Sequence, residues 1–116
     1  MSSSSSAIVY TPETERTLAF GSISGTYAPV GLPLAFASVQ LILQNQTNAA
    51  ISFSFNGSTS AITLAAGSIF FSDVQANRDG QNPFRVPQGT QFYVSGAPTS
   101  GAVYISSFYA NSRNEL

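Results

Sequence analysis

The chain of 116 residues contains no cysteine, no histidine and no lysine, and its four basic residues are all arginines. Without cysteine there is no disulfide framework and no thiolate chemistry. Without histidine the chain lacks the commonest general base and metal ligand, and without lysine it cannot form a Schiff base. Its many serines therefore have no side chain of these kinds to activate them. We predict that the protein is not an enzyme and binds no cofactor and no metal.

Charge is also scarce, because charged residues make up 8% of the chain and the net charge is −1. An ordinary soluble domain has about 25% charged residues, which keep its surface hydrated and separate from its neighbours. We therefore expect protein partners, in the first place copies of the same chain, to cover much of this surface. Four scattered arginines form no basic patch for nucleic acid, and no apolar run approaches the ~20 residues of a membrane span.

The clearest structural signal is a strict alternation in the middle of the chain. Ile51, Phe53 and Phe55 share one face of an extended segment, and Ser52 and Ser54 share the other. A period of two indicates a half-buried antiparallel strand. The dipeptide that follows, 56–57, is Asn-Gly, the strongest short hairpin signal, so residues 60–64 are expected to return as the partner strand.

Further β-prone segments recur about every ten residues, separated by turns rich in Gly, Pro and Asn. This spacing predicts an all-β fold, a single antiparallel β-sandwich of the jelly-roll or immunoglobulin-like kind with an extended N-terminal arm. The expected parts are a flexible arm and loop (1–33), a sandwich core (34–110) and a polar C-terminal tail (111–116). Within the core, the pattern predicts strands over 34–44, 68–74, 90–95 and 102–109, a polar turn over 45–48 and a long loop over 75–88.

The N-terminal arm is rich in loop residues yet apolar in places. Either it lies on an adjacent subunit, adding a strand to the edge of that subunit's sheet, or it packs on its own domain. Two arginines of the second long loop are candidates for the rim of an interface. The predicted interface residues are Ile8, Val9, Tyr10, Leu18, Phe20, Tyr27, Arg78 and Arg85.

Other constellations have both a chemical and a plain structural interpretation. Asp73, Asn77 and Asp79 followed by Gly80 are calcium-type ligands, but the spacing is not that of the twelve-residue calcium loop. An ordinary turn, with an ion pair from an arginine of the same loop, explains them better. Two sequons begin at Asn45 and Asn56, and both are interpreted as turns because the sequence shows no secretory signal.

Exposed aromatic residues on a sheet face would suit a carbohydrate-binding module. The tyrosines at 93, 104 and 109 are the candidates. Aromatic residues at alternating strand positions more often belong to a core or to a protein interface. Carbohydrate binding therefore stays the alternative of another class.

The segment from 41 to 105 resembles small all-β virion proteins of tailed bacteriophages. Four blocks carry the resemblance: 45–57 with its Asn-Gly turn, Leu64-Ala65-Ala66-Gly67-Ser68, Gly89-Thr90-Gln91-Phe92-Tyr93-Val94 and Gly101-Ala102-Val103-Tyr104-Ile105. The residues from Arg16 to Gly31 are similar to the leading arm of those proteins.

The resemblance implies a homo-oligomeric structural subunit built by edge pairing and arm exchange, at the head–tail connector or tail of the virion or, as the alternative, as a capsid decoration (cement) protein. We expect a closed ring or a trimer, because homo-oligomers generally have closed symmetry. The rival of another class is a carbohydrate-binding or receptor-binding module of a fibre. Its partners would be copies of itself and other virion proteins. The protein would be made in the host cytoplasm and would reside in the virion.

Overall fold

The computed structural model describes residues 5–73 and 86–115, and almost all of its regular structure is extended. The strands are β1 (Ser5–Pro12), β2 (Arg16–Ala19), β3 (Ala28–Pro29), β4 (Gln40–Thr47), β5 (Ile51–Ser54), β6 (Ile62–Leu64), β7 (Ile69–Asp73), β8 (Tyr93–Gly96) and β9 (Gly101–Glu115). A single 3-10 turn, η1 (Phe20–Ser22), follows β2. No helix in this part of the chain is long and apolar enough to cross a membrane.

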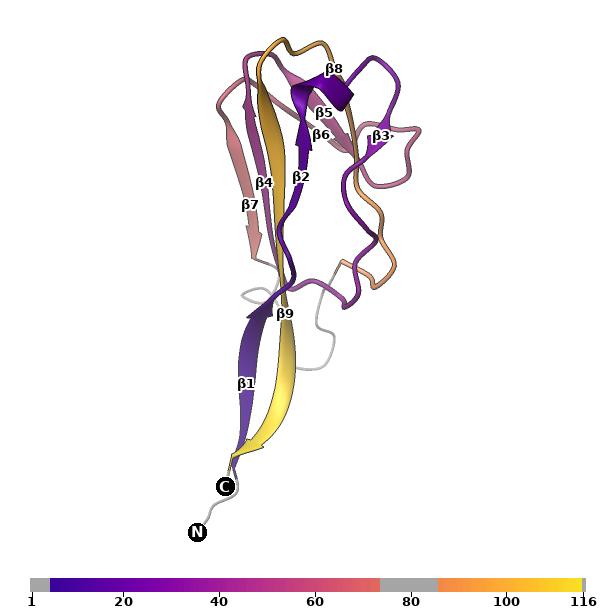
Figure 1. Cartoon of the computed structure of the whole chain (residues 1–116). Coiled ribbons are helices and arrows are strands. Elements are labelled where there is room, and N and C mark those ends of the chain that lie inside the picture. Colours follow the sequence, from indigo (N-terminus) through magenta and orange to yellow (C-terminus); the bar gives the residue numbers. More distant parts are fainter. Residues whose placement is uncertain (1–4, 74–85, 116) are drawn as a thin grey trace.

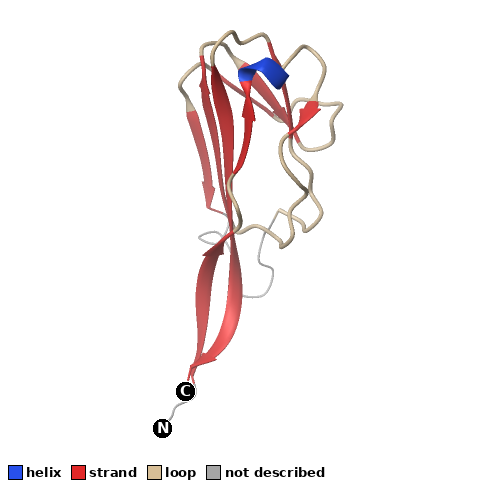
Figure 2. Cartoon of the chain, viewed as in Figure 1, coloured by secondary structure: helices blue, strands red, loops and turns tan. Residues whose placement is uncertain are grey.

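Two antiparallel sheets face each other in the upper part of the molecule (Figures 1 and 2). The first has the strand order β1-β9-β4-β7, with β2 also pairing with β9, and the second has the order β3-β8-β5-β6. The prediction of an all-β antiparallel sandwich is therefore confirmed. Pairing between β5 and β6, with Ile51 opposite Leu64 and Phe53 opposite Ile62, confirms the predicted return of the chain after the Asn-Gly turn.

Alternation along the central strands builds the core. In β4, Leu41 and Leu43 point inward between half-buried neighbours, and Val103 and Ile105 do the same in β9. They meet inward side chains of the opposite sheet, and burying this apolar surface is the main stabilising contribution to such a fold. The buried cluster comprises Ile23, Val30, Leu34, Leu41, Leu43, Ile51, Phe53, Leu64, Phe92, Val94, Val103 and Ile105.

A two-stranded ribbon continues from the first sheet beyond the sandwich. β9 pairs with β4 only as far as Phe108, whereas its remaining residues to Glu115 pair with β1 alone. In Figure 1 this ribbon projects from the sandwich, and the pair Ser5 and Glu115 lies at its far end. The molecule is correspondingly long, with principal-axis extents of 58 × 23 × 22 Å.

The ribbon changes the expected division of the chain in two places. Residues 111–115 belong to β9 and are not a separate tail. Much of the segment 1–33 belongs to the sandwich, because β2 pairs with β9 and because Ile23 and Val30 are buried in the core. The N-terminal segment extends away from the sandwich only through β1, and there it pairs with its own chain.

The start and end of β4 also differ from the sequence-based expectation. The predicted strand 34–44 begins only at Gln40, because Leu34 is held in a loop by backbone hydrogen bonds with Thr90 and Gly89. The predicted turn at 45–48 is wrong over its first three residues, which continue β4 to Thr47. Asn45 and Thr47 point into the core and their polar atoms are hydrogen-bonded there, so a polar stretch can remain a strand.

Candidate functional site

The junction between ribbon and sandwich holds the one ion pair that the structure describes, between the largely buried side chains of Glu13 and Arg16. Arg16 Nη2 lies 2.8 Å from Glu13 Oε1, and the two side chains are only 8% and 7% exposed. Residues three apart on a regular strand would point to opposite faces of the sheet. A local irregularity between β1 and β2 must therefore bring the two side chains together.

That irregularity is visible in the strand register. Pro12 pairs with Phe108 on β9, so that the two residue numbers add to 120, whereas Arg16 pairs with Ile105 and the sum is 121. One extra residue is therefore inserted between β1 and β2, in the manner of a β-bulge. The insertion reverses the alternation and turns both Glu13 and Arg16 toward the interior of the sandwich.

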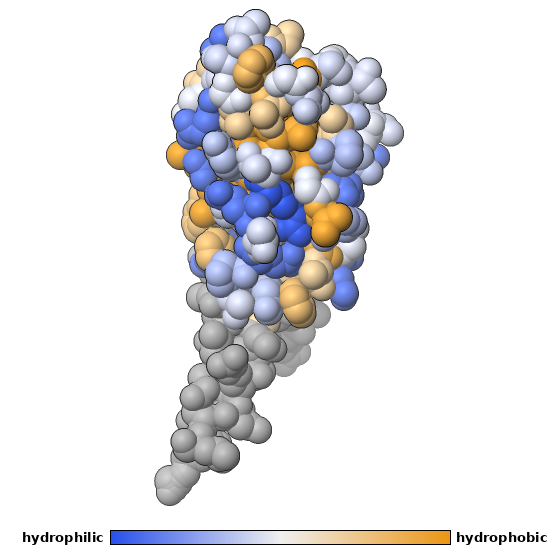
Figure 3. Space-filling model, viewed as in Figure 1, coloured by the Kyte–Doolittle hydropathy of each residue, from blue (hydrophilic) through white to orange (hydrophobic). Residues whose placement is uncertain are grey.

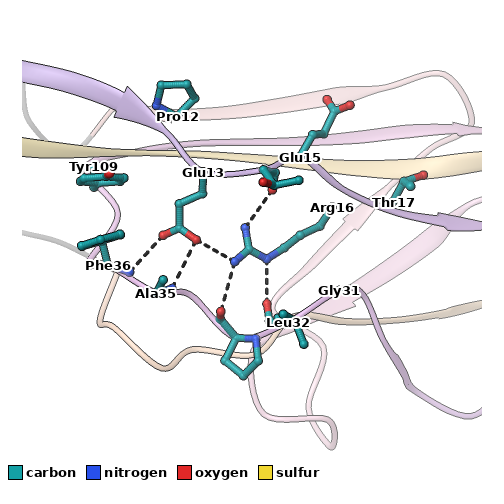
Figure 4. Close-up of a pocket in the computed structure, with 12 residues that line it drawn as sticks. Pro12, Glu13, Glu15, Arg16, Thr17, Gly31, Leu32, Ala35, Phe36 and Tyr109 are labelled. Carbon is teal, nitrogen blue, oxygen red and sulfur yellow. Dashed lines mark hydrogen bonds and ion pairs between the residues drawn. The ribbon is translucent and has the colours of Figure 1, made fainter.

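Arg16 fastens this bulge to the loop that follows β3 (Figure 4). Its Nε donates to the Leu32 carbonyl oxygen at 2.7 Å, and its Nη2 donates to the Pro33 carbonyl oxygen at 3.1 Å. Nη1 donates to the Thr14 carbonyl oxygen at 3.4 Å. Since a buried guanidinium requires its donors to be satisfied, these bonds make Arg16 a structural clip.

Glu13 completes the same network from the acceptor side. Its Oε2 accepts the Phe36 backbone N–H at 3.0 Å, and its Oε1 accepts that of Ala35 at 3.3 Å. Burial alone would raise the pKa of Glu13, but the hydrogen bonds from Arg16, Ala35 and Phe36 outweigh it and hold the pKa below its ordinary value. The carboxylate is thus ionised and fully engaged, which makes it a poor general acid or base.

Around this clip lies a groove of about 620 Å³, lined by Pro12, Glu13, Thr14, Glu15, Arg16, Thr17, Gly31, Leu32, Pro33, Ala35, Phe36 and Tyr109. Phe36 stacks on Tyr109 with ring centroids 3.9 Å apart, so the loop after β3 contacts the first ribbon residue of β9. Leu32 and Phe36 remain 77% and 48% exposed. The groove combines an apolar rim with a polar network that has little capacity left for a ligand.

Apolar side chains are also exposed elsewhere on the sandwich, and Figure 3 shows hydrophobic residues among hydrophilic ones on its visible face. On the edge strand β7, Ile69 and Phe71 point outward and are 58% and 56% exposed. Phe20 in η1 is 41% exposed. Outside the buried ion pair, Glu15 is the one charged residue in the ranges 11–72 and 86–110, and its carboxylate accepts a hydrogen bond from Ser106 Oγ.

The predicted interface residues lie in three different environments. Ile8, Val9 and Tyr10 belong to β1, where they pair with Ser112, Asn111 and Ala110 of β9. Leu18 is half-buried and packs against the core of its own chain, Phe20 is exposed and Tyr27 is half-buried. Arg78 and Arg85 lie outside the described residues.

The alternative binding residues that the structure describes lie in different places. Asp73 is the last residue of β7, and the other proposed calcium ligands lie outside the described residues, together with their candidate arginine partners. In the part of the chain that is described, three or more acidic side chains nowhere converge as a metal site would require. Of the three candidate tyrosines, Tyr109 is on the groove and stacks with Phe36, and Tyr93 packs beside Gly57 on the other sheet.

The two sequons also differ in their surroundings. Asn45 is fully buried, and its Nδ2 donates to the carbonyl oxygens of Ala49, Leu64 and Ala65 at 2.8, 2.9 and 3.1 Å. Its amide nitrogen is therefore unavailable for glycosylation in the folded chain. Asn56 is exposed and accepts backbone N–H bonds from Ser58 and Thr59, which is the predicted turn.

Glu13, Glu15 and Arg16 are the densest group of charges in the sequence, but their spacing alone does not indicate that two of them form a buried ion pair. The predicted interface residues do not include four exposed apolar ones, Phe36, Leu32, Ile69 and Phe71. Of these, Ile69 and Phe71 lie at alternating positions of an edge strand, and that pattern could have indicated them from the sequence. Comparisons with known protein families, with curated proteins and with solved structures found no match for this chain. What the fold and the junction define is an all-β sandwich that carries a ribbon made of its two ends.

Proposed function

We propose that this protein is a non-enzymatic structural subunit that assembles with copies of itself through the ribbon formed by β1 and the distal half of β9. The ribbon is the observation that carries this proposal. Two-stranded ribbons are at best marginally stable alone in water and gain stability from a third strand or a packed face. A chain that extends both of its ends into such a ribbon presents open strand edges to a neighbour.

The charge distribution supports the same proposal. Glu13 and Arg16 neutralise each other in the junction, which leaves Glu15 and, at the end of β7, Asp73 as the other charged residues from 11 to 73 and from 86 to 110. Exposed Ile69, Phe71 and Leu32 add apolar surface. Surfaces of this composition are typical of proteins that are covered by partners.

The resemblance of the sequence to small virion proteins of tailed phages gives the proposal its particular form. The assembly would be part of a phage particle, at the head–tail connector or tail, with capsid decoration as the alternative location. This form is supported by the resemblance alone. Imaging an intact particle with antibody-labelled protein tests it, and label that is absent from purified particles would contradict it.

The general proposal is tested by measuring the mass of the full chain in solution over a range of concentrations. Sedimentation velocity should show a discrete oligomer at micromolar concentration. Because few charges are involved, the oligomer should persist from about 0.05 M to about 1 M sodium chloride, a range over which screening abolishes surface electrostatics. A monomer at every concentration and salt level would overturn the proposal.

One observation favours a second candidate function, carbohydrate binding at the aromatic pair on the rim of the groove. Phe36 is half exposed and its ring is held in place by stacking on Tyr109, as in an aromatic platform for a sugar ring. A glycan array with the purified chain, repeated with the Phe36→Ala variant, tests this function. Saturable binding that Phe36→Ala abolishes supports it, and binding that the substitution leaves unchanged contradicts it.

A further inference from the structure

The open edge of β1 has a defined pattern of hydrogen-bonding groups. Glu13 continues the β1–β9 register and donates its backbone N–H to the Ser107 carbonyl oxygen at 2.9 Å. In an antiparallel pair, residues alternate between directing both backbone groups at the partner strand and directing both away. The backbone N–H and C=O groups of residues 7, 9 and 11 therefore point toward β9, whereas those of Ser6, Ile8 and Tyr10 point away from it.

Two further observations agree with this assignment. Pro12, which has no N–H, occupies an outward-directed position, where proline is tolerated at a sheet edge. The Phe108 carbonyl oxygen accepts a hydrogen bond from the backbone N–H of Val39, on the side of β9 opposite to β1. Within the described chain β1 pairs with β9 alone, so the groups of Ser6, Ile8 and Tyr10 receive no strand partner from that part of the molecule.

This edge lacks the features that usually prevent pairing between proteins. Edge strands are commonly protected by charged residues, by a bulge or by an internal proline. From Ser5 to Thr11 the strand has no charged residue and no proline, and its register with β9 is continuous. The bulge comes only after Pro12, where the groove at the ribbon junction begins.

We propose that β1 pairs antiparallel with β1 of a second copy across a two-fold axis that passes midway between the two Ile8 residues. This inference rests on the proposed function and names the contact that builds the assembly. A two-fold axis perpendicular to a continuous sheet leaves every side chain on the same face of the sheet, and directly opposed residues of two antiparallel strands also share a face. Because side chains alternate between faces along a strand, the two residue numbers of each opposed pair must add to an even sum. A sum of 16 is the longest such overlap that leaves Pro12 outside the paired segment.

In this register Ile8 lies opposite the partner subunit's Ile8, and Ser6 lies opposite the partner subunit's Tyr10. All of these residues direct their backbone groups outward, so each pair can exchange two hydrogen bonds. Each β1 strand is neutral, and the pairing therefore brings no like charges together.

The absence of cysteine from the chain makes disulfide trapping a clean test. Cα atoms of a hydrogen-bonded antiparallel pair are about 5.5 Å apart, which a disulfide can bridge. Ile8→Cys should therefore form a covalent dimer on mild oxidation. Ser6→Cys and Tyr10→Cys are on the same strand. In the proposed dimer, however, the Cα atom of each cysteine lies about 13 Å from that of the same residue in the second copy, so each variant should cross-link at least about ten-fold more slowly than Ile8→Cys.

The decisive part of this experiment is to mix two of the cysteine variants. Ser6→Cys and Tyr10→Cys proteins, slow to cross-link separately, should form a mixed disulfide rapidly when they are combined. Parallel pairing would instead cross-link Ser6→Cys with itself. Equal rates for all three single variants would indicate random collision. Either of these two results overturns the proposal.

A proline substitution gives a second readout that leaves the sandwich intact. Ile8→Pro removes an N–H that faces away from β9 and should convert the oligomer to monomer, whereas Ile8→Ala keeps the N–H and should still assemble. Circular dichroism checks that both variants fold. If the wild type is an oligomer and Ile8→Pro leaves it unchanged, this inference fails while the proposed function survives. If the wild type is monomeric, both fail.

Discussion

Gly31 leaves room for Arg16: a Cβ atom built at position 31 would lie 2.6 Å from Arg16 Cγ, well inside van der Waals contact. Gly31 also has a φ of +65°, which side chains with a Cβ rarely adopt. The loop after β3 therefore passes over the aliphatic part of Arg16 while its carbonyl oxygens bind the guanidinium. One glycine thus makes the whole clip at the ribbon junction possible.

Gly31→Ala should accordingly destabilise the protein by about 2–4 kcal/mol, through backbone strain added to a steric clash. The free energy of unfolding in urea measures the effect. Gly25→Ala is the matched control, since a Cβ at position 25 would meet no atom within 4 Å and Gly25 does not have a positive φ. Equal stabilities of the two variants would contradict the structure of the clip.

The lowered pKa of Glu13 predicts a dependence of stability on pH. Because the folded pKa lies below the ordinary value of 4.5, the contribution of Glu13 is fully present above that value and is lost as the pH falls through the folded pKa. Glu13→Gln removes the charge and should cost about 2 kcal/mol at pH 7. The difference between wild type and variant should shrink below pH 4.5, in denaturant titrations at several pH values.

Glu15 supplies the control for this prediction. It is exposed, and its carboxylate interacts with Ser106 Oγ. Glu15→Gln should change the stability by no more than about 0.5 kcal/mol at any pH. If the difference in stability between the wild type and Glu13→Gln stayed constant down to acid pH, the ion pair would not be what stabilises the junction.

Asn45 and Asn56 offer a second matched pair. Asn45 Nδ2 faces three carbonyl oxygens in the core, so Asn45→Asp would place a carboxylate against them and should cost about 3–5 kcal/mol. Asn56 uses only its Oδ1 for the backbone N–H groups of Ser58 and Thr59, so Asn56→Asp should be nearly neutral. Thermal unfolding of the two variants decides the point, and a tolerated Asn45→Asp would contradict the buried amide.

The alternation along β7 is testable in the same way. Phe70 packs against the core and Phe71 is 56% exposed on the outer face of the sheet. Phe70→Ala should cost about 2–4 kcal/mol, and Phe71→Ala less than about 1 kcal/mol. If the larger loss followed substitution of Phe71, the strand would be shifted by one residue from the register described.

The strands were predictable where the buried face carries apolar residues and the other face polar ones. Ile51 and Phe53 alternate with serines, and the period of two indicated the strand directly. Asn45 was placed in a turn because its neighbours are polar. The carbonyl groups that satisfy its amide belong to residues up to twenty positions away, and a local pattern cannot show them. Burial of a polar residue is a property of the assembled core.

The ribbon junction shows the same limit. Glu13, Glu15 and Arg16 are the densest group of charges in the sequence, but the bulge that turns two of them inward exists only in the register with β9. The segment before residue 34 was assigned to an arm because it is rich in Gly, Ser and Pro. Val30, buried between these residues, joins part of that segment to the core.

Pairing of Ser5 with Glu115 has a mechanical consequence. A tension that pulls the two ends of the chain apart acts across the tip of the ribbon, and would unzip β1 from β9 one residue pair at a time. Separation of the two strands would reach the Glu13–Arg16 clip before the tension acts on any strand of the sandwich. The same tension applied along β9 would instead shear its whole ladder with β4 at once. The protein should therefore yield easily to a pull between its ends and resist one along its longest strand.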